Sequence, residues 1–240
     1  MEITRPTSNI KVKSKKKRTP LKYRIMPNYT RSEEIFNMVT HIIGSILAVT
    51  ITVMCIVKAA QKGNALGVAT CSIYGAFVFI MFTMSSIYHG LLPSLGKRVM
   101  QVIDHCDIYF CIAGTYTPIL LLGVIKINPI LGWALFCIQW ITAIVACVFT
   151  AIDIKKYFKL SFACYLIMGW CIIIAFIPTL QSMTIAGFMW VLFGGVSFTL
   201  GAIIYIIGKK TNKKYAHAIF HIFVVLGVIL QFFGIYLHLI

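Results

Sequence analysis

The last apolar run of the chain begins with the stretch Tyr215-Ala216-His217-Ala218-Ile219-Phe220-His221. Residues four apart lie on one face of an α-helix, so a single turn separates the imidazoles of His217 and His221. This is the spacing at which two histidines bind one divalent metal ion. Two ligands start such a site without completing it, and the remaining ligands must come from other segments of the chain.

The composition indicates an integral membrane protein. The 240 residues are 60% hydrophobic, whereas the apolar share of a soluble domain is nearer a half. Seven runs, each nearly free of charge, reach the length of about 20 residues that a helix needs to cross the bilayer. We predict an all-α polytopic protein of the cell membrane, a seven-transmembrane helix bundle, rather than a barrel, whose strands are shorter. The runs lie at residues 36–57, 65–89, 103–125, 129–152, 160–180, 184–208 and 217–239.

Membrane topology explains the distribution of the basic residues. The formal net charge is +16, and ten of the 22 Lys and Arg residues lie within residues 1–31. Nine others follow the second, fourth and sixth runs, and three fall in the alternate loops. Because cytoplasmic loops carry an excess of Lys and Arg, we predict the N-terminus in the cytoplasm and the C-terminus outside. We expect no nucleic acid partner.

Residues 1–31 are predicted to form a basic, disordered cytoplasmic tail ahead of a membrane domain at residues 32–240. The tail contains no apolar core of the kind found in a cleavable signal peptide. Its cluster Lys11-x-Lys13-x-Lys15-Lys16-Lys17-Arg18 could bind anionic lipid headgroups, with about 1 kcal/mol contributed by each basic residue near the surface. A tail that only sets the topology is the alternative.

Further candidate residues stand at the end of the second run and at the start of the third. Ser85 and His89 share a helix face one turn apart, and Asp104 and Asp107 are three residues apart. A lone histidine near a helix end is usually an interfacial residue, and the helix dipole alone explains Asp107 unless it joins a buried polar network. Asp104 lies closer to the loop than a cap requires, and acidic residues near the membrane are functional candidates.

The first run enters the membrane with a polar stripe of Glu34, Asn37 and His41. Ser32 fits the position of an N-cap, and Glu33 and Glu34 in the first turn complement the helix dipole. Capping alone explains the glutamates. A buried polar network that includes Glu34 and Asn37 explains the stripe equally well.

The predicted topology brings these groups to one depth. The second helix runs inward and ends at His89, whereas the third and the seventh run outward and begin at Asp104 and His217. All of them, with Glu34, fall in the cytoplasmic leaflet. Three histidines with a carboxylate nearby match a catalytic type of zinc centre, in which three protein ligands leave a fourth position for water.

Together these motifs resemble the hemolysin III family, which is related to the progestin and adipoQ receptors and, more distantly, to the alkaline ceramidases. The resemblance covers about residues 30–240. It implies a seven-helix bundle with Zn2+ held by His89, His217 and His221. It also implies that Asp104 lies near the water that the metal activates and that Ser85 belongs to the same pocket. The motifs are Glu34-x-x-Asn37, Ser85-x-x-x-His89, Ile103-Asp104-His105-Cys106-Asp107, Ala113-Gly114-Thr115-Tyr116-Thr117-Pro118 and His217-x-x-x-His221.

Three functions agree with this pattern. A zinc-dependent hydrolase would cleave an amide or ester of a membrane lipid, with Asp104 accepting a proton from water. A non-enzymatic membrane regulator or receptor-like protein would use zinc only to hold helices together. A channel or pore-type cytolysin needs a polar wall, and no run carries a continuous polar stripe through the membrane.

The orientation can be tested by cysteine-accessibility labelling or reporter fusions. We expect residues 1–31 and 209–216 on the cytoplasmic side and Ile240 outside, because the basic residues mark the cytoplasmic loops. A cytoplasmic C-terminus would contradict both the topology and the predicted meeting of the polar groups.

Overall fold

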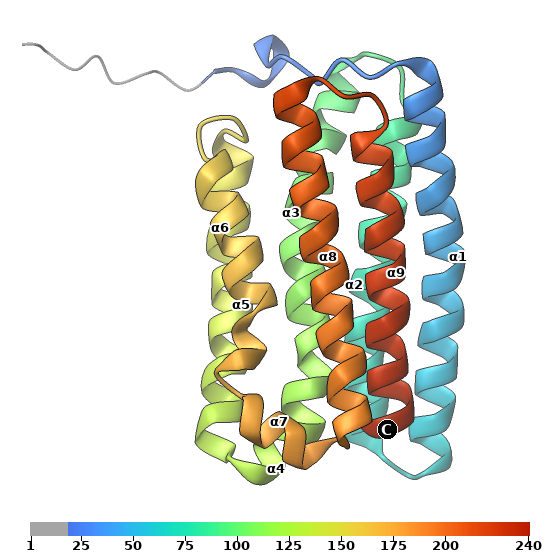
Figure 1. The fold of residues 1–240 in the computed structure, drawn as a ribbon, viewed down its shortest axis with the longest axis vertical. Helices are drawn as coiled ribbons and strands as arrows, with labels where there is room; N and C mark the ends of the chain where they lie inside the picture. Colours follow the sequence, from blue (N-terminus) through green and yellow to red (C-terminus); the bar gives the residue numbers. More distant parts are fainter. Residues whose placement is uncertain (1–18) are drawn as a thin grey trace, which may run out of the picture.

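The computed structural model describes residues 19–240, and within these residues it contains helices and no strand. The long helices lie side by side in one bundle (Figure 1), so the predicted all-α membrane class is confirmed. Residues 1–18, which hold the basic cluster from Lys11 to Arg18, lie outside the described residues. Six spans are long and apolar enough to cross a membrane: α1 (Arg31–Gln61), α2 (Ala65–Gly90), α3 (Leu95–Pro118) with its continuation to Ile127, α5 (Pro129–Ile152), α8 (Ile185–Thr211) and α9 (Ala216–His238).

The fifth of the seven predicted spans is broken. The run predicted at 160–180 forms α6 (Phe158–Gly169), η3 (Cys171–Ile173) and α7 (Phe176–Ser182), and its two parts are bent by 58°. Pro178 has no N–H to donate to the carbonyl four residues earlier, so a helix can start near this proline but cannot run through it undisturbed. The bundle therefore has six crossings, or seven when the bent pair counts as one.

The third span passes through its internal proline. Helix α3 continues beyond Pro118 into a π-helical segment, η2 (Ile119–Val124), and then into α4 (Ile125–Ile127). A local π adjustment re-satisfies backbone groups that a proline leaves without partners. The span consequently crosses as one element. In its most apolar stretch 67% of the residues are buried, so this span lies at the centre of the bundle.

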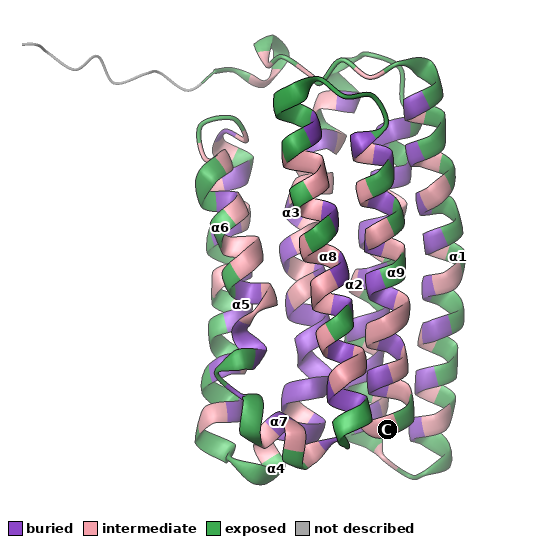
Figure 2. Cartoon of the chain, in the orientation of Figure 1, coloured by how far each residue is buried: buried purple, intermediate pink, exposed green. Residues whose placement is uncertain are grey.

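Burial follows the helical period. Figure 2 shows buried positions recurring along one side of α1, between exposed ones. The exposed side carries large apolar residues such as Ile42, Ile43 and Ile46. In a soluble protein such a surface would be costly, whereas in a bilayer it faces hydrocarbon.

Helix α1 begins with a capping box. The hydroxyl of Thr30 accepts a hydrogen bond from the backbone N–H of Glu33 at 3.3 Å, and the Glu33 carboxylate accepts one from the N–H of Thr30 at 2.9 Å. The prediction that Ser32 is the N-cap is wrong, since Ser32 lies inside the first turn. The Glu33 carboxylate also accepts a hydrogen bond from the N–H of Tyr215 at 2.7 Å, which joins the start of α1 to the start of α9.

The opposite ends of α1 and α9 are also bonded. The ammonium of Lys58 donates to the carbonyl of Tyr236, and that of Lys62 donates to the carbonyl of Ile240. Cations stabilise the C-terminal end of a helix, where carbonyl groups lack partners. These contacts explain two of the three lysines that fall in the loops predicted to lie outside.

Helices α8 and α9 lie side by side (Figure 1). Small residues at their interface let them pack closely. Glycines recur every seven residues on α8, at Gly187, Gly194, Gly201 and Gly208, and each lies against α9. Ser197, one turn before Gly201, donates its hydroxyl to a backbone carbonyl of α9 at 2.8 Å. Small residues let the two backbones approach. This packing fixes the position of the first turns of α9.

Residues 19–30 lie across the end of the bundle at which α1 and α9 begin (Figure 1). They include a short 3-10 turn, η1 (Leu21–Tyr23). Arg24 donates from Nη2 to the carbonyl of Ile152 at 2.5 Å, and Arg98 donates from Nε to the carbonyl of Arg24 at 3.2 Å. The described part of the predicted tail therefore contacts the helices.

Gly194 and Gly195 offer a matched test of the close packing. A Cβ at Gly194 would lie 3.0 Å from the carbonyl oxygen of Gly227, whereas a Cβ at Gly195 would meet nothing within 4 Å. We expect Gly194→Ala to destabilise the protein by about 1–3 kcal/mol through overpacking. Gly195→Ala should be neutral or stabilising by up to about 1 kcal/mol, because alanine favours a helix. Thermal unfolding in detergent measures both, and equal melting temperatures would contradict the assigned interface.

Candidate metal centre

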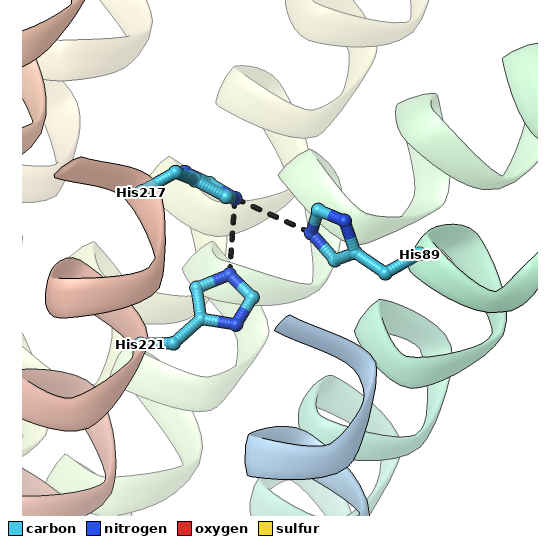
Figure 3. Close-up of side chains that lie close together, drawn as sticks. All are labelled: His89, His217 and His221. Carbon is cyan, nitrogen blue, oxygen red and sulfur yellow. Dashed lines mark hydrogen bonds between the residues drawn. The ribbon is translucent and has the colours of Figure 1, made fainter. Parts of the chain in front are cut away.

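Three histidines converge where α2 ends and α9 begins. Nε2 of His217 lies 3.3 Å from Nε2 of His89 and 3.0 Å from Nε2 of His221, as the dashed lines in Figure 3 show. His89 and His221 are each 2% exposed, and His217 is half-buried. The structure thus brings together the three histidines that the sequence analysis had grouped.

The imidazoles have the geometry of a metal-binding set. One ligand atom from each histidine lies within 4.8 Å of the other two. Two nitrogens bound to one tetrahedral ion such as zinc, at 2.0–2.1 Å from it, lie about 3.3 Å apart. The Nε2 separations of 3.0 and 3.3 Å are close to that value. Each neutral imidazole has one N–H, so three facing Nε2 atoms cannot all be satisfied by hydrogen bonds among themselves.

A carboxylate from α1 orients His89. Nδ1 of His89 lies 2.6 Å from Oε2 of Glu34, and Oε1 of Glu34 lies 2.7 Å from Nζ of Lys97. When Nδ1 donates to the carboxylate, the lone pair of Nε2 points to the centre, and such pairing fixes the ring and raises its basicity as a ligand. Lys97 is 4% exposed. The distribution of basic residues predicts a cytoplasmic loop at Lys97 and not this buried ion pair.

Helix α1 also lies against His221. Nδ1 of His221 lies 3.4 Å from the carbonyl oxygen of Asn37, and Nδ2 of Asn37 lies 3.4 Å from Nδ1 of His89. His41 stacks on His221, with ring centroids 3.7 Å apart and planes 11° apart. The helical spacing predicts that His41 shares a face with Asn37, but it does not predict the contact of His41 with His221. A buried polar network, and not capping alone, therefore surrounds the first turns of α1.

Two tyrosines cover His217. The ring of Tyr29, just before α1, stacks on the His217 ring, with ring centroids 5.2 Å apart and planes 16° apart. The ring centroid of Tyr205 on α8 lies 5.1 Å from that of His217. Burial raises the pKa of the Tyr29 hydroxyl well above its ordinary value, so this tyrosine stays neutral. Sequence reasoning missed Tyr29 because it stands in a polar segment ahead of the apolar runs.

Asp104 stands beside the histidines without joining their cluster. Its side chain is 14% exposed and lies 3.5 Å from Nδ1 of His105. Ser85 and His89 lie near its carboxylate. Asp107, one turn deeper along α3, has a buried carboxylate oxygen with no hydrogen-bond partner among residues 19–240. The structure therefore brings Ser85 and Asp104 to His89 and places Asp107 further along the helix.

The chain matches a protein-family model described as Haemolysin-III related over residues 29–232. This range contains the three histidines together with Glu34 and Asp104. No solved structure matches the chain.

Curated relatives cover most of the chain. Hemolysin-3 of Bacillus cereus is 37% identical over 201 residues, which are 84% of this chain and 89% of the relative. The Hemolysin-3 homolog of Bacillus subtilis (strain 168) is 38% identical over 205 residues, 85% of this chain and 93% of the relative. Monocyte to macrophage differentiation factor of Homo sapiens is 27% identical over 179 residues, 71% of this chain and 70% of the relative.

Metal content tests the centre directly. We expect the purified protein to hold about one divalent ion per chain, and a double variant with His217→Ala and His221→Ala to lose it, because a single ligand remains. Glu34→Gln keeps the ligands and should weaken metal affinity by about 10–100-fold through loss of the orienting carboxylate. His105→Ala alters a histidine outside the set and should retain the ion. Elemental analysis after gel filtration measures each variant, and full metal in the double variant would remove the assignment.

Proposed function

The chain belongs to the haemolysin-III-related family, and we propose that it is a zinc-dependent hydrolase that cleaves an amide or ester bond of a membrane lipid. The observation that carries the proposal is the convergence of the Nε2 atoms of His89, His217 and His221. Three protein ligands that leave one position free are typical of catalytic zinc sites, whereas structural sites have four.

Zinc fits the donor set best. Imidazole nitrogens suit zinc, copper, iron and nickel, and zinc alone among these combines a tetrahedral preference with no redox chemistry. Among residues 19–240, the metal-binding group contains no fourth protein donor. When bound, zinc supplies a Lewis acid that polarises a carbonyl oxygen and lowers the pKa of water.

Asp104 is the base in this proposal. Attack of water on the carbonyl carbon releases a proton, and a carboxylate within reach accepts it and later returns it to the leaving amine or alcohol. The shielded Asp104 carboxylate, with Ser85 and His105 as neighbours, suits this task. Ser85 orients the carboxylate. Glu34 holds His89 in the orientation that directs Nε2 to the centre.

The position of the centre favours a lipid substrate. The three histidines lie at the ends of membrane-spanning helices. In the predicted topology this end lies in the cytoplasmic leaflet, at the depth where the amide and ester bonds of lipids are found. A substrate from the bilayer therefore needs no transfer into water to reach the histidines.

A structural zinc centre is the second candidate, and one observation favours it. The ligands come from α2 and α9, and Glu34, which supports His89, belongs to α1. A bound ion would hold three helices together, as expected for a non-enzymatic membrane regulator or receptor-like protein. In that case Asp104 has no chemical role.

A pore-type cytolysin, which the names of the bacterial relatives bring to mind, has less support. Most buried side chains deeper in the bundle are apolar, among them Ile51, Val78 and Phe82. Buried hydroxyls such as those of Thr117 and Ser197 donate to backbone carbonyls. A water-filled pore needs polar or charged groups along its wall.

Asp104→Asn distinguishes the enzyme from the structural centre. The amide keeps the shape of the side chain and loses the base, so zinc content and melting temperature should be retained. We expect turnover of lipid amides or esters to fall by about 10²–10⁴-fold, the usual contribution of general acid–base catalysis. Asp107→Asn, one turn along the same helix, is the matched control and should change turnover much less.

Metal content, melting temperature and lipid cleavage are measured on Asp104→Asn, Asp107→Asn and His89→Ala in one membrane preparation. Unchanged turnover in Asp104→Asn would exclude the catalytic role of this residue. If His89→Ala abolished the function through loss of folding stability while Asp104→Asn left it intact, the zinc would be structural.

A further inference from the structure

A cavity of about 1080 Å³ opens beside the candidate centre, between residues 19–30 and the ends of α3, α6, α8 and α9. His217, Tyr29 and Tyr205 belong to its wall. Figure 1 shows these segments together at one end of the bundle. A molecule that fills this cavity would therefore lie against the half-buried histidine of the metal-binding set.

The cavity wall is strongly basic. It contains two carboxylates, Glu33 and Asp153, which already accept hydrogen bonds from the backbone N–H groups of Tyr215 and Lys156. Burial alone would raise the pKa of Asp153, but the backbone N–H groups and Arg24 hold it below its ordinary value, so Asp153 keeps its negative charge. Six cations outnumber these two anions: Arg24, Lys155, Lys209, Lys210, Lys213 and Lys214.

Two of these lysines reach the cavity from different elements. Lys155 belongs to the loop before α6, and Lys209 belongs to α8. The ammonium of Lys209 lies 4.4 Å from the ring centroid of Phe158 and 5.6 Å from that of Tyr205, which holds it at the cavity. Within residues 19–240 neither lysine forms an ion pair. An anion in the cavity would be attracted by both lysines.

Arg24 adds a donor that lacks an acceptor. Its Nη2 donates to the carbonyl of Ile152 and its Nε to that of Thr19, but its Nη1 is buried and has no partner among the described residues. A buried donor without an acceptor is destabilising, because it has lost its hydrogen bonds to water. A guanidinium is also the group that best recognises a phosphate.

The cavity wall also contains apolar side chains. Ile154 from the loop before α6, Phe158 from α6 and Ile206 from α8 line it. The neighbouring residues of α8, Ile203 and Ile207, are exposed. The cavity thus combines cationic with apolar lining residues, and one of the apolar residues neighbours the exposed face of α8.

The positive-inside rule explains why lysines occur at this end, but it does not explain their place in a cavity. Lys156 and Lys159 follow the same rule, and they do not line the cavity. Membrane topology requires basic residues in a loop and leaves the direction of their side chains free. The gathering of cations beside His217 therefore points to a ligand.

We propose that this cavity binds the anionic, phosphate-bearing headgroup of a lipid. The inference deepens the proposed function, on which it rests for the role of the lipid as substrate. Lys155, Lys209 and Arg24 hold the phosphate, and the acyl chain lies along Phe158 and Ile206. The bond to be cleaved then lies between them, beside His217, so an anionic lipid is preferred to a zwitterionic one.

Equilibrium binding tests the proposal without relying on turnover. A fluorescent short-chain phosphatidic acid is titrated into the full-length protein in detergent, and phosphatidylcholine of the same chain length serves as the zwitterionic comparison. We expect Lys155→Gln with Lys209→Gln to weaken binding of phosphatidic acid by about tenfold or more, since each basic residue contributes about fivefold. Lys156→Gln with Lys159→Gln removes the same charge from the same face and should change binding by less than about twofold.

Two outcomes would overturn the proposal. Equal weakening by both double variants would mean that general surface charge attracts the lipid. Displacement of phosphatidic acid by an equal concentration of inorganic phosphate would identify the ligand as a soluble anion.

The His221→Ala variant separates this inference from the proposed function. Its substitution removes a metal ligand that is not part of the cavity wall, so phosphatidic acid should still bind when metal and turnover are lost. Tight, lysine-dependent binding by a wild-type protein that cleaves no lipid would refute the hydrolase and support the headgroup site.

Discussion

The arrangement of the centre depends on the contacts that the Glu34 carboxylate makes with His89 and Lys97. The carboxylate belongs to α1 and lies between His89 of α2 and Lys97 of α3. A charged group buried in a membrane protein is costly unless a partner of opposite charge accompanies it. The Glu34 carboxylate therefore favours the arrangement of the three helices in which it contacts both the His89 imidazole and the Lys97 ammonium. The direction of the His89 ring is a property of this three-helix junction and not of α2 alone.

Packing, rather than charge, places the other two histidines. A Cβ at Gly208 would lie 2.0 Å from the Cβ of Ala216, so only glycine lets the end of α8 come this close to the residue before His217. Hydrogen bonds between α1 and α9 at both ends, from Tyr215 to Glu33 and from Lys58 to the last turn of α9, fix the register of the two helices. A substitution of Gly208 would thus displace the start of α9 and, with it, His217 and His221.

The sequence predicts those features that are local to a helix. Hydropathy and length predict the spans, and the four-residue spacing of His217 and His221 predicts a shared face, because both depend only on the helical period. Topology then predicts that His89 meets them. The contacts of Tyr29 with His217, of Lys97 with Glu34, and of His41 with His221 join distant parts of the chain. No periodicity marks such pairs, so the sequence does not predict them. The orientation in the membrane and the identity of the metal stay predictions.

Because Tyr29 covers His217, the rate at which a metal ion would leave the three histidines depends on more than the affinity of the histidines for it. The tyrosine ring covers one face of His217, and the segment that carries it is held to the helices mainly by hydrogen bonds of Arg24 and Arg98. Segments held in this way open locally, at a free-energy cost far below that of global unfolding. A chelator in solution would then remove an ion from the three histidines faster when residues 19–30 lift away, because Tyr29 no longer covers His217. Slow exchange of metal in this protein would report the closure of its N-terminal segment.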